Sequence, residues 1–414
     1  MNKPLSEDPQ FRQLLAMAKA PVTRRTALAG VSATAAAIAL AACAPGGAKK
    51  TLTPAKDLSA TEKVVVWDNW AYYMDGESDG TFPTLHAFEK KTGIKYTYNV
   101  NVDDNNTYFA RVKNQLASGQ DIGADTVCLT DWIVSRFITS GYLQPLQYDK
   151  LANVSANLND AFKTTFGSFD EGRKYSLPWK GIIAGIGYHK KRYKELTGKD
   201  APTSFDDVFE NEALKGHVEV LSEMRDTLGV IMMAKGVDIT SFSKTDFENA
   251  IDFFKKKVAD GWIRGIKGNA YVDDFKSGDA VAGIVWAGDI VGANAELGSD
   301  ELGLVLLDSG STFACDNYII PMGSPHAANA HALIDYYFDP AVAAELALAG
   351  VNYVTPVNGA KEIVSAKNPA LASNTLMFPT ADDFATKLHA FRPLTPAEDN
   401  DFSKLWSDAA NGVV

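Results

Sequence analysis

The sequence has few of the side chains that carry enzymatic or metal chemistry. It contains three cysteines and six histidines among 414 residues, and the histidines are scattered without the spacing of metal ligands. It also lacks the G-x-S-x-G motif that surrounds the nucleophile of many hydrolases. We therefore expect no catalytic residues, no bound metal and no cofactor, and a protein that is not an enzyme.

An excess of positive charge is also absent, because the formal net charge is −11. This balance argues against nucleic acid as a partner. It is compatible with a cationic ligand, although many soluble proteins are acidic. Apolar residues make up 46% and charged residues 22% of the chain, as in a globular protein, and the length is sufficient for two lobes.

Long apolar runs are missing too, apart from a weakly hydrophobic stretch of about 17 residues, 26–42. Arg24 and Arg25 precede this stretch, and it ends in Leu-Ala-Ala before Cys43. A basic pair, a short apolar segment and small residues are typical of an export signal, here of the twin-arginine type. The ending is similar to a lipoprotein cleavage site, so we predict that residues 1–42 are removed and that Cys43 carries lipid. The alternative is a single membrane-spanning anchor, for which the stretch is short.

The segment that follows is predicted to be a tether. Residues 43–61 are small, polar and rich in Pro, Gly and Lys, as in a flexible connection between a lipid anchor and a folded body. If Cys43 is lipidated, Cys128 and Cys315 remain. Export permits a disulfide between them, but both lie in apolar, strand-like runs, so two free buried thiols are an equal alternative.

From residue 62 onward, strand and helix patterns alternate. Residues 94–100 alternate apolar and polar side chains, as a half-buried strand does. Residues 246–258 place their apolar side chains on one helix face, and Ser243 can cap that helix. The alternation predicts an α/β body with largely parallel sheets. In such sheets, ligands bind beyond the carboxyl ends of the strands.

Four predicted strands end in aromatic or acidic side chains, which suggests a common cleft. The first leads into Trp-Asp-Asn-Trp-Ala-Tyr-Tyr at 67–73. Here we expect Trp70 and Tyr73 to face a ligand, and Trp67, with Tyr72 as a second candidate, to face the core. The other three strands lead into Thr130-Asp131-Trp132, Ser222-Glu223-Met224-Arg225-Asp226 and Trp286.

Short motifs occur in a fixed order along about 300 residues. They are Asn69-Trp70 with Tyr73, Phe88-x-x-x-Thr92-Gly93-Ile94, Gly141-Tyr142-Leu143 before Pro145-Leu146, Gly283-Ile284-Val285-Trp286, Phe313-Ala314-Cys315-Asp316 running to Ile320-Pro321, and Tyr353-Val354-Thr355-Pro356. In their order and spacing, the chain from about residue 63 to its C-terminus resembles the extracytoplasmic polyamine-binding proteins of ABC importers, the spermidine/putrescine-binding type.

The resemblance implies a two-lobed, periplasmic-binding-protein-like α/β fold with crossing hinge strands and an inter-lobe cleft. The crossings are expected near Pro178–Ile182, near Asp316 and near Gly359–Ile363. Lobe one would then comprise residues 62–180 and 316–361. Lobe two would comprise residues 181–315 and 362–414.

The resemblance also implies which residues line lobe one's side of the cleft. Trp70 and Tyr73 match aromatic residues of that side, and Trp132 stands where the family has a second aromatic. Thr130 matches a hydroxyl donor, and Tyr353 matches the last aromatic of the site.

The acidic residues come mainly from the other side. Glu223 and Asp226 occupy a pair of acidic positions on lobe two, and Trp286 matches a stacking residue. Asp316 matches the carboxylate that pairs with an ammonium group, and burying a carboxylate after an apolar run is costly unless it is paired. Arg392 aligns with a neutral amide of the family's site, where it would repel a cation unless an acidic residue neutralises it.

The implied function is that of a substrate-binding lipoprotein of an ABC importer. It would capture a polyamine through carboxylates and aromatic rings, as a monomer, and deliver it to permease subunits that work with a cytoplasmic ATPase. It would be anchored to the outer face of the cytoplasmic membrane. Ala314, where the family commonly has tryptophan, and Arg392 leave open which polyamine is bound.

Other functions remain open at this point. Carboxylates and aromatic rings also bind sugars, so a sugar-binding transport protein or an exported glycosidase is the alternative. Ferric-ion binding would use adjacent tyrosines, but Tyr336 and Tyr337 lie in a helix-like segment, where a place in the core is the better interpretation.

Overall fold

The computed structural model describes residues 51–410. The predicted export signal, Cys43 and the first part of the tether lie outside the described residues. Among the residues that are described, none of the helices combines the length and the apolar character needed to cross a membrane.

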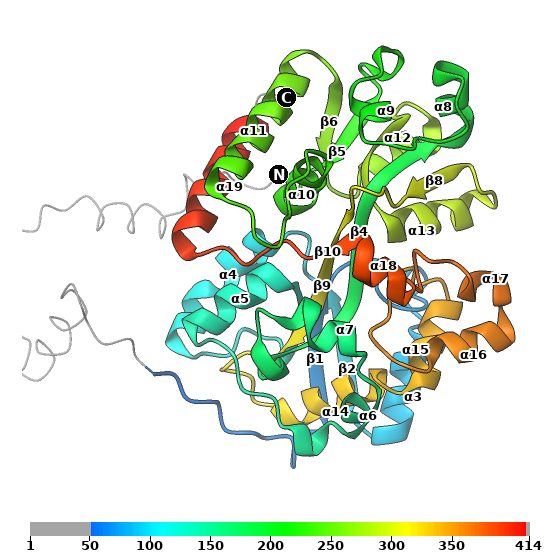
Figure 1. Ribbon diagram of the computed structural model, residues 1–414. Coiled ribbons are helices and arrows are strands. Elements are labelled where there is room, and N and C mark those ends of the chain that lie inside the picture. The colour runs from blue at the N-terminus through cyan, green and yellow to red at the C-terminus, as the bar shows by residue number, and fades with distance from the viewer. Residues whose placement is uncertain (1–50, 411–414) are drawn as a thin grey trace, which may run out of the picture. The chain divides into compact units, whose positions relative to one another are not determined.

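One mixed sheet of ten strands runs through the described chain (Figure 1). Its strand order is β2-β1-β3-β9-β4-β7-β5-β6, with β10 paired to β9 and β8 paired to β4. The strands are β1 Val64–Asn69, β2 Lys95–Val100, β3 Thr126–Thr130, β4 Ser176–His189, β5 Val218–Leu221, β6 Ile263–Lys267, β7 Ala282–Trp286, β8 Leu302–Val305, β9 Ser311–Ile319 and β10 Leu388–His389.

Strand direction changes in the middle of this sheet. Strand β1 is parallel to β2 and β3, and β5 is parallel to β6 and β7. Strands β4 and β9 are antiparallel to each other. Strand β3 is antiparallel to its neighbour β9, and β7 is antiparallel to its neighbour β4. The prediction of largely parallel sheets is therefore correct for the two ends only, because β4 and β9 are the segments along which the chain crosses from one end to the other.

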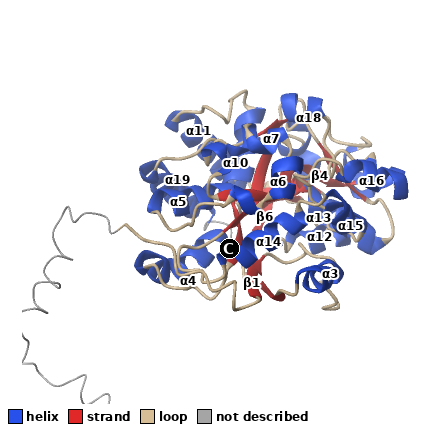
Figure 2. Cartoon of the chain, turned by 90° about the horizontal axis from the view of Figure 1, so that it is seen from below, coloured by secondary structure: helices blue, strands red, loops and turns tan. Residues whose placement is uncertain are grey.

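Helices cover both faces of the sheet (Figure 2). Local signals set their ends: the Ser243 side chain caps α11 in a reciprocal capping box with Asp246, as the sequence predicts. The helices are α3 Pro83–Thr92, α4 Asn105–Ser118, α5 Asp131–Ser140, α6 Ala152–Asn157, α7 Asp160–Lys163, α8 Lys190–Thr197, α9 Asp206–Phe209, α10 Met224–Ala234, α11 Lys244–Ala259, α12 Tyr271–Ser277, α13 Ala287–Leu297, α14 Ala327–Tyr337, α15 Pro340–Leu348, α16 Ala360–Lys367, α17 Pro369–Ala372, α18 Ala381–Thr386 and α19 Pro396–Ala410.

The buried side chains form separate cores at the two ends of the sheet. Two clusters, one around Trp67 and one around Phe137, form what we call the first-lobe core. A larger cluster around Ile284 forms the second-lobe core. Between them, Phe162 and Phe313 pack with Cys315 where the strands cross.

The chain leaves the first lobe for the last time at a later residue than the sequence predicts. Val364 and Met377 are buried in the first-lobe core, so residues 362–378 do not belong to lobe two as expected. The apolar faces of α16 and α17 account for this, because they pack against lobe one. The chain next joins the central strands at β10, where Leu388 pairs with Ser311.

Several side chains of the first lobe settle questions that the sequence left open. Cys128 and Cys315 are both buried free thiols, not a disulfide. Tyr336 and Tyr337 are 7% and 1% exposed within the first-lobe core, as predicted. Trp67 is also in that core, but Tyr72 is 68% exposed, because φ of 64° at Tyr72 turns the chain and directs its side chain outward.

Candidate functional site

A buried carboxylate, Asp316, lies where three segments of the first lobe meet. Strands β3 and β9 pair with Thr130 opposite Asp316, and the Thr130 hydroxyl donates a hydrogen bond to Oδ1 at 2.7 Å. The Tyr73 hydroxyl donates to Oδ2 at 2.6 Å. Burial raises the pKa of Asp316 to about 6 even though these two donors lower it. Both donors nevertheless hold the carboxylate in one orientation.

A second carboxylate, Asp226, lies in the first turn of α10. The indole N–H of Trp286, at the end of β7, donates to Asp226 Oδ2 at 2.8 Å. The Thr312 hydroxyl on β9 donates to Oδ1 at 2.6 Å. Burial raises the pKa of this carboxyl group as well. Trp286 therefore orients an acidic residue with its ring edge, in addition to the stacking role predicted for it.

A third carboxylate, Asp289 in the first turn of α13, was not predicted. It accepts hydrogen bonds from the hydroxyl of Tyr271 at 2.8 Å and from the amide of Asn269 at 2.9 Å. The Tyr353 hydroxyl donates to its other oxygen at 3.3 Å. Tyr353 packs on the first-lobe core, so this bond joins the lobes. The available signal was its place three residues after Trp286, but an acidic residue in a first helical turn also suits the helix dipole.

Two stacked tyrosines connect the first of these carboxylates, Asp316, with the third, Asp289. The rings of Tyr73 and Tyr353 are stacked, with centroids 4.5 Å apart. Because Tyr73 binds Asp316 and Tyr353 binds Asp289, the stack links a carboxylate of the first lobe to one of the second. The predicted residues Tyr73, Thr130, Asp316 and Tyr353 are therefore brought together.

Glu223 and Trp132 are arranged around a residue that the sequence did not single out, Arg225. The Glu223 carboxylate caps α10 and lies 3.8 Å from the Arg225 guanidinium. Burial raises the pKa of Glu223 to about 7, although Arg225 opposes this. The same guanidinium lies 4.0 Å from the centroid of the Trp132 ring, in a cation–π contact. The ring face that it covers is not open to a ligand.

Trp70 is half-buried and packs against both clusters of the first-lobe core. Its indole N–H, like that of Trp132, is buried without a hydrogen-bond partner among residues 51–410. A buried N–H without a partner is costly, so each ring carries a donor available to a ligand or to water.

Arg392, which was predicted to line the cleft, has its guanidinium occupied by partners outside the predicted site. Its guanidinium binds both carboxylate oxygens of Glu398, at 2.6 and 3.2 Å, and donates to the Phe242 carbonyl at 2.9 Å. It also lies 4.2 Å from the Phe242 ring centroid. Every one of these partners belongs to neighbouring second-lobe segments, and none is a predicted site residue.

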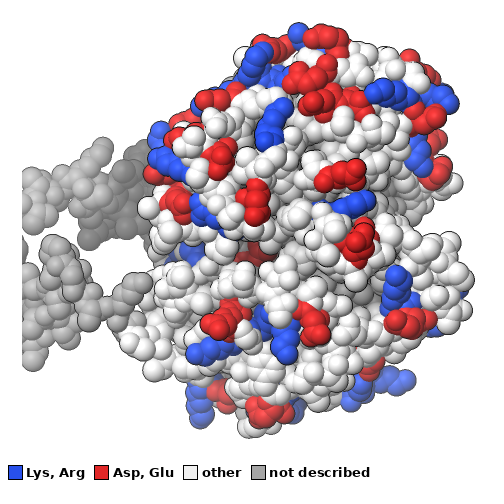
Figure 3. Space-filling model, viewed as in Figure 1, with Lys and Arg blue, Asp and Glu red and all other residues white. Residues whose placement is uncertain are grey.

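Negative charge is concentrated in this region. Asp131, in the first turn of α5, is a further carboxyl group, and burial raises its pKa to about 6. The negative charges of Asp131 and Asp226 both raise the pKa of Asp316. On the face viewed in Figure 3, acidic and basic side chains are interspersed, so this concentration of negative charge is not a feature of that surface. The arrangement is suited to binding cations.

The same carboxylates do not form a metal site. Among the described residues, no group of three or more His, Cys, Asp or Glu side chains is placed to hold a metal ion. Their partners are tyrosine, threonine, tryptophan and asparagine side chains and backbone N–H groups, which leaves remaining lone pairs for an organic cation.

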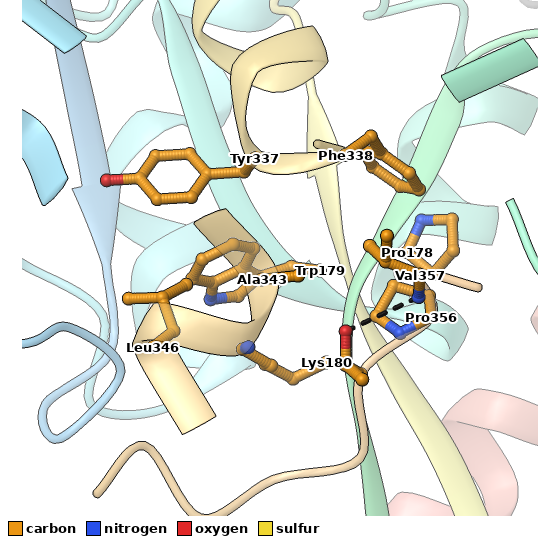
Figure 4. Close-up of a pocket in the computed structure, with 10 residues that line it drawn as sticks. Pro178, Trp179, Lys180, Tyr337, Phe338, Ala343, Leu346, Pro356 and Val357 are labelled. Carbon is orange, nitrogen blue, oxygen red and sulfur yellow. Dashed lines mark hydrogen bonds between the residues drawn. The ribbon is translucent and has the colours of Figure 1, made fainter. Parts of the chain in front are cut away.

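A separate shallow hollow lies beside the crossing strand β4, and none of the predicted site residues lines it (Figure 4). Lys180, which lines it, is 2% exposed, and its Nζ lies 4.5 Å from the centroid of the Trp179 ring. Burial lowers the pKa of Lys180 to about 7. No carboxylate of the described chain forms an ion pair with this amine.

Comparison with known proteins agrees with this architecture. The chain is 26% identical over 364 residues to the putrescine-binding periplasmic protein PotF of Escherichia coli (strain K12), covering 86% of this chain and 93% of PotF. It is 26% identical over 352 residues to spermidine/putrescine-binding periplasmic protein 1 of Haemophilus influenzae, covering 85% and 90%. Among solved structures, the spermidine/putrescine ABC transporter substrate-binding protein PotD of Streptococcus pneumoniae superimposes with a TM-score of 0.69 at 21% identity, covering 85% of this chain and 99% of that one.

Fold and site together define a two-lobed binding protein of the periplasmic type, with hinge strands between the lobes, and so confirm the predicted fold class. Residues 83–377 match the model of one family, described as bacterial extracellular solute-binding protein. The chain belongs to the bacterial extracellular solute-binding protein family. It is a binding protein of transport systems and not an enzyme, as predicted.

Proposed function

We propose that the protein captures a polyamine, a small flexible chain with two or more ammonium groups, and delivers it to the permease of an ABC importer. The observation that carries this proposal is the set of buried carboxylates at the lobe junction. These carboxylates outnumber the positively charged side chains placed with them. Asp131, Asp226, Asp289 and Asp316 are all buried or half-buried there, and Arg225 acts on only some of them.

The polar contacts suit ammonium groups. A charge-assisted hydrogen bond from an ammonium to a carboxylate contributes roughly 1.5–3 kcal/mol. A cation–π contact adds about 0.5–2 kcal/mol, most where water is excluded. Two carboxylates and several rings therefore suffice for micromolar affinity, about −8 kcal/mol. Asp316 and Asp289 are bound by the hydroxyls of the two stacked tyrosines, Tyr73 and Tyr353, so two carboxylates are available for the two ends of a diamine.

The relatives support the same class of ligand. The matched curated proteins are named for binding putrescine or spermidine, and the chain spans at least nine-tenths of those two proteins. Their names describe those proteins. For this chain, the carboxylates and the tyrosine stack are the independent support.

Titration calorimetry tests the proposal. A chain that begins at Lys49 is suitable, because the residues from Leu52 onward form one compact unit. We expect saturable micromolar or tighter binding of putrescine, spermidine or spermine, and no response to maltose. Binding of maltose without binding of any amine would overturn the proposal in favour of the sugar-binding alternative.

We further propose that the protein acts as an exported lipoprotein, anchored through Cys43 and working as a monomer. The support is the sequence of residues 24–43, with its paired arginines and its small residues before the cysteine. Labelling with a fatty-acid analogue tests it in a bacterial host. Cys43→Ala should abolish labelling and release the protein from the membrane fraction, and replacing Arg24 and Arg25 by lysine should block export.

A further inference from the structure

An ion-pair cluster lies beside the predicted site, and it adds two residues, Asp399 and Arg136, to the Arg225 contacts described above. Its centre is Asp399 on α19. Asp399 Oδ1 accepts a hydrogen bond from Arg225 Nη2 at 2.8 Å, and Oδ2 accepts one from Arg136 Nη2. One carboxylate therefore binds two guanidinium groups, one on each oxygen.

Asp399 belongs to the second lobe. Phe402 and Trp406 of the same helix are part of the second-lobe core, and the Phe402 ring stacks on Phe247 with centroids 3.9 Å apart. The Trp406 indole N–H donates to the Ser222 carbonyl at 3.0 Å. Helix α19 is therefore fixed to the second lobe by packing and does not depend on Asp399 for its position.

Arg136 belongs to the first lobe. It lies on α5, whose residues Ile133, Val134 and Phe137 are in the first-lobe core. The Arg136–Asp399 bond therefore joins the two lobes. The contact of Arg225 with Trp132 also joins them, because Trp132 packs on the first-lobe core and Arg225 lies on α10.

The cluster is shielded enough from water for its charges to matter. The side chains of Asp399 and Arg225 are 14% and 11% exposed, and that of Arg136 is 30% exposed. Arg225 and Arg136 hold the pKa of Asp399 below its usual value despite its burial. Partly buried pairs are screened less by salt than exposed ones.

An ion pair between the lobes can form only when the two lobes lie close together, as they do at Arg136 and Asp399. A contact present in one conformation and absent in the other shifts the equilibrium toward the first. The bond between Asp399 and Arg225 lies within the second lobe, so it persists on opening and keeps the carboxylate oriented toward Arg136.

We propose that Asp399 is a positioning residue for ligand retention: with Arg136 and Arg225 it forms an interlobe latch that holds the lobes closed and slows release of the bound molecule. The effect on release rests on the proposed function, whereas the effect on lobe closure does not. Of the predicted ligand-binding carboxylates, the latch contacts only Glu223, which the Arg225 guanidinium faces.

The first test measures the dissociation rate of putrescine by stopped-flow tryptophan fluorescence. Asp399→Asn should accelerate release at least about fivefold, Asp399→Glu should restore part of the loss, and high salt should reduce the difference between wild type and Asp399→Asn. Glu398→Gln is the matched control, because Glu398 is the neighbouring acid on α19 and binds Arg392 within the second lobe. Equal rates for Asp399→Asn and Glu398→Gln would overturn the latch.

The second test needs no ligand. Spin labels at Lys113→Cys and Lys255→Cys, which are exposed positions on α4 of the first lobe and α11 of the second, report the distance between the lobes. Without ligand, Asp399→Asn should shift the distances toward longer values, and Glu398→Gln should not. An unchanged distribution would overturn the latch. If no amine binds, the proposed function fails while this measurement still decides whether the latch exists.

Discussion

The rings of Tyr73 and Tyr353 stack with centroids 4.5 Å apart, and each hydroxyl donates to a different buried carboxylate, Asp316 in the first case and Asp289 in the second. The two residues come from segments about 280 positions apart in the sequence. Their contact connects two buried carboxylates through one aromatic pair. This relationship underlies the proposed binding of a molecule with a positive charge at each end.

Removing the charge of Asp316 should weaken amine binding. Asp316→Asn keeps the side-chain size but removes the charge and replaces one carboxylate oxygen by an NH2 group, which cannot accept the hydrogen bond from Tyr73 or Thr130 that this oxygen accepted. We expect the dissociation constant for putrescine to rise at least about tenfold, because a charge-assisted bond is lost. Calorimetry checks this, with Asp335→Asn as the control, since Asp335 caps first-lobe backbone N–H groups of Asn153 and Val154. Unchanged affinity would remove Asp316 from the site.

Amine binding should weaken as pH falls. Burial raises the pKa of Asp316 to about 6 and that of Glu223 to about 7, so both carboxylates become neutral between pH 8 and pH 5.5 while aliphatic ammonium groups stay charged. We expect the affinity for putrescine to fall by at least about tenfold over this range, and protons to be released on binding near pH 6.5. Calorimetry in buffers of different ionisation enthalpy measures both effects. Affinity independent of pH would contradict these protonation states.

Lys180 should destabilise the folded protein in a pH-dependent way. Burial lowers its pKa from 10.5 to about 7, so between these values the unfolded chain binds a proton that the folded one does not. The cost of burial is therefore largest below pH 7 and disappears as pH rises toward 10.5. Lys180→Met should raise the free energy of unfolding by roughly 3–5 kcal/mol at pH 6 and by less at pH 9.5. Urea unfolding at both pH values measures this, and a gain that does not change with pH would contradict it.

Arg392 should have little influence on ligand affinity. Its guanidinium is held by Glu398 and by the Phe242 carbonyl, so its charge is already paired. Arg392→Gln should leave the dissociation constant for putrescine within about twofold of wild type, and should lower stability by about 1 kcal/mol. Tighter amine binding by the variant would show that the arginine does act on the cleft.

The strands and helices with strong local signals were predictable from the sequence. The strands predicted to lead into Ser222 and Trp286 are present as Val218–Leu221 and Ala282–Trp286, because short apolar runs between turn signals permit little else. The helix expected at 246–258 spans Lys244–Ala259, since the Ser243 cap fixes where it begins. The later crossing could not be predicted, because α16 and α17 carry no signal of the lobe on which they pack.

The site was predictable to the extent that it follows strand ends. Thr130 and Trp286 lie at the ends of β3 and β7, as the strand pattern predicts, whereas Asp316 lies within β9 and was singled out by the resemblance and by the apolar run before it. The role of Arg225 could not be predicted, because its contact with Trp132 depends on how the two lobes meet. Asp289 was missed because the acidic residue of a first helical turn has an adequate local explanation. Tyr72 was misassigned because a left-handed residue in a loop breaks the alternation of inward and outward side chains.

The continuous pairing of β4 with β9 has a consequence for how the molecule comes apart. Each of these strands is hydrogen-bonded over most of its length to the other, and β3 and β7 on either side complete the sheet. If the strands of one lobe unfolded, the strands of the other lobe would lose the neighbours to which they are hydrogen-bonded. Scanning calorimetry of the chain from Lys49 should therefore show one cooperative melting transition, with no intermediate in which a single half survives.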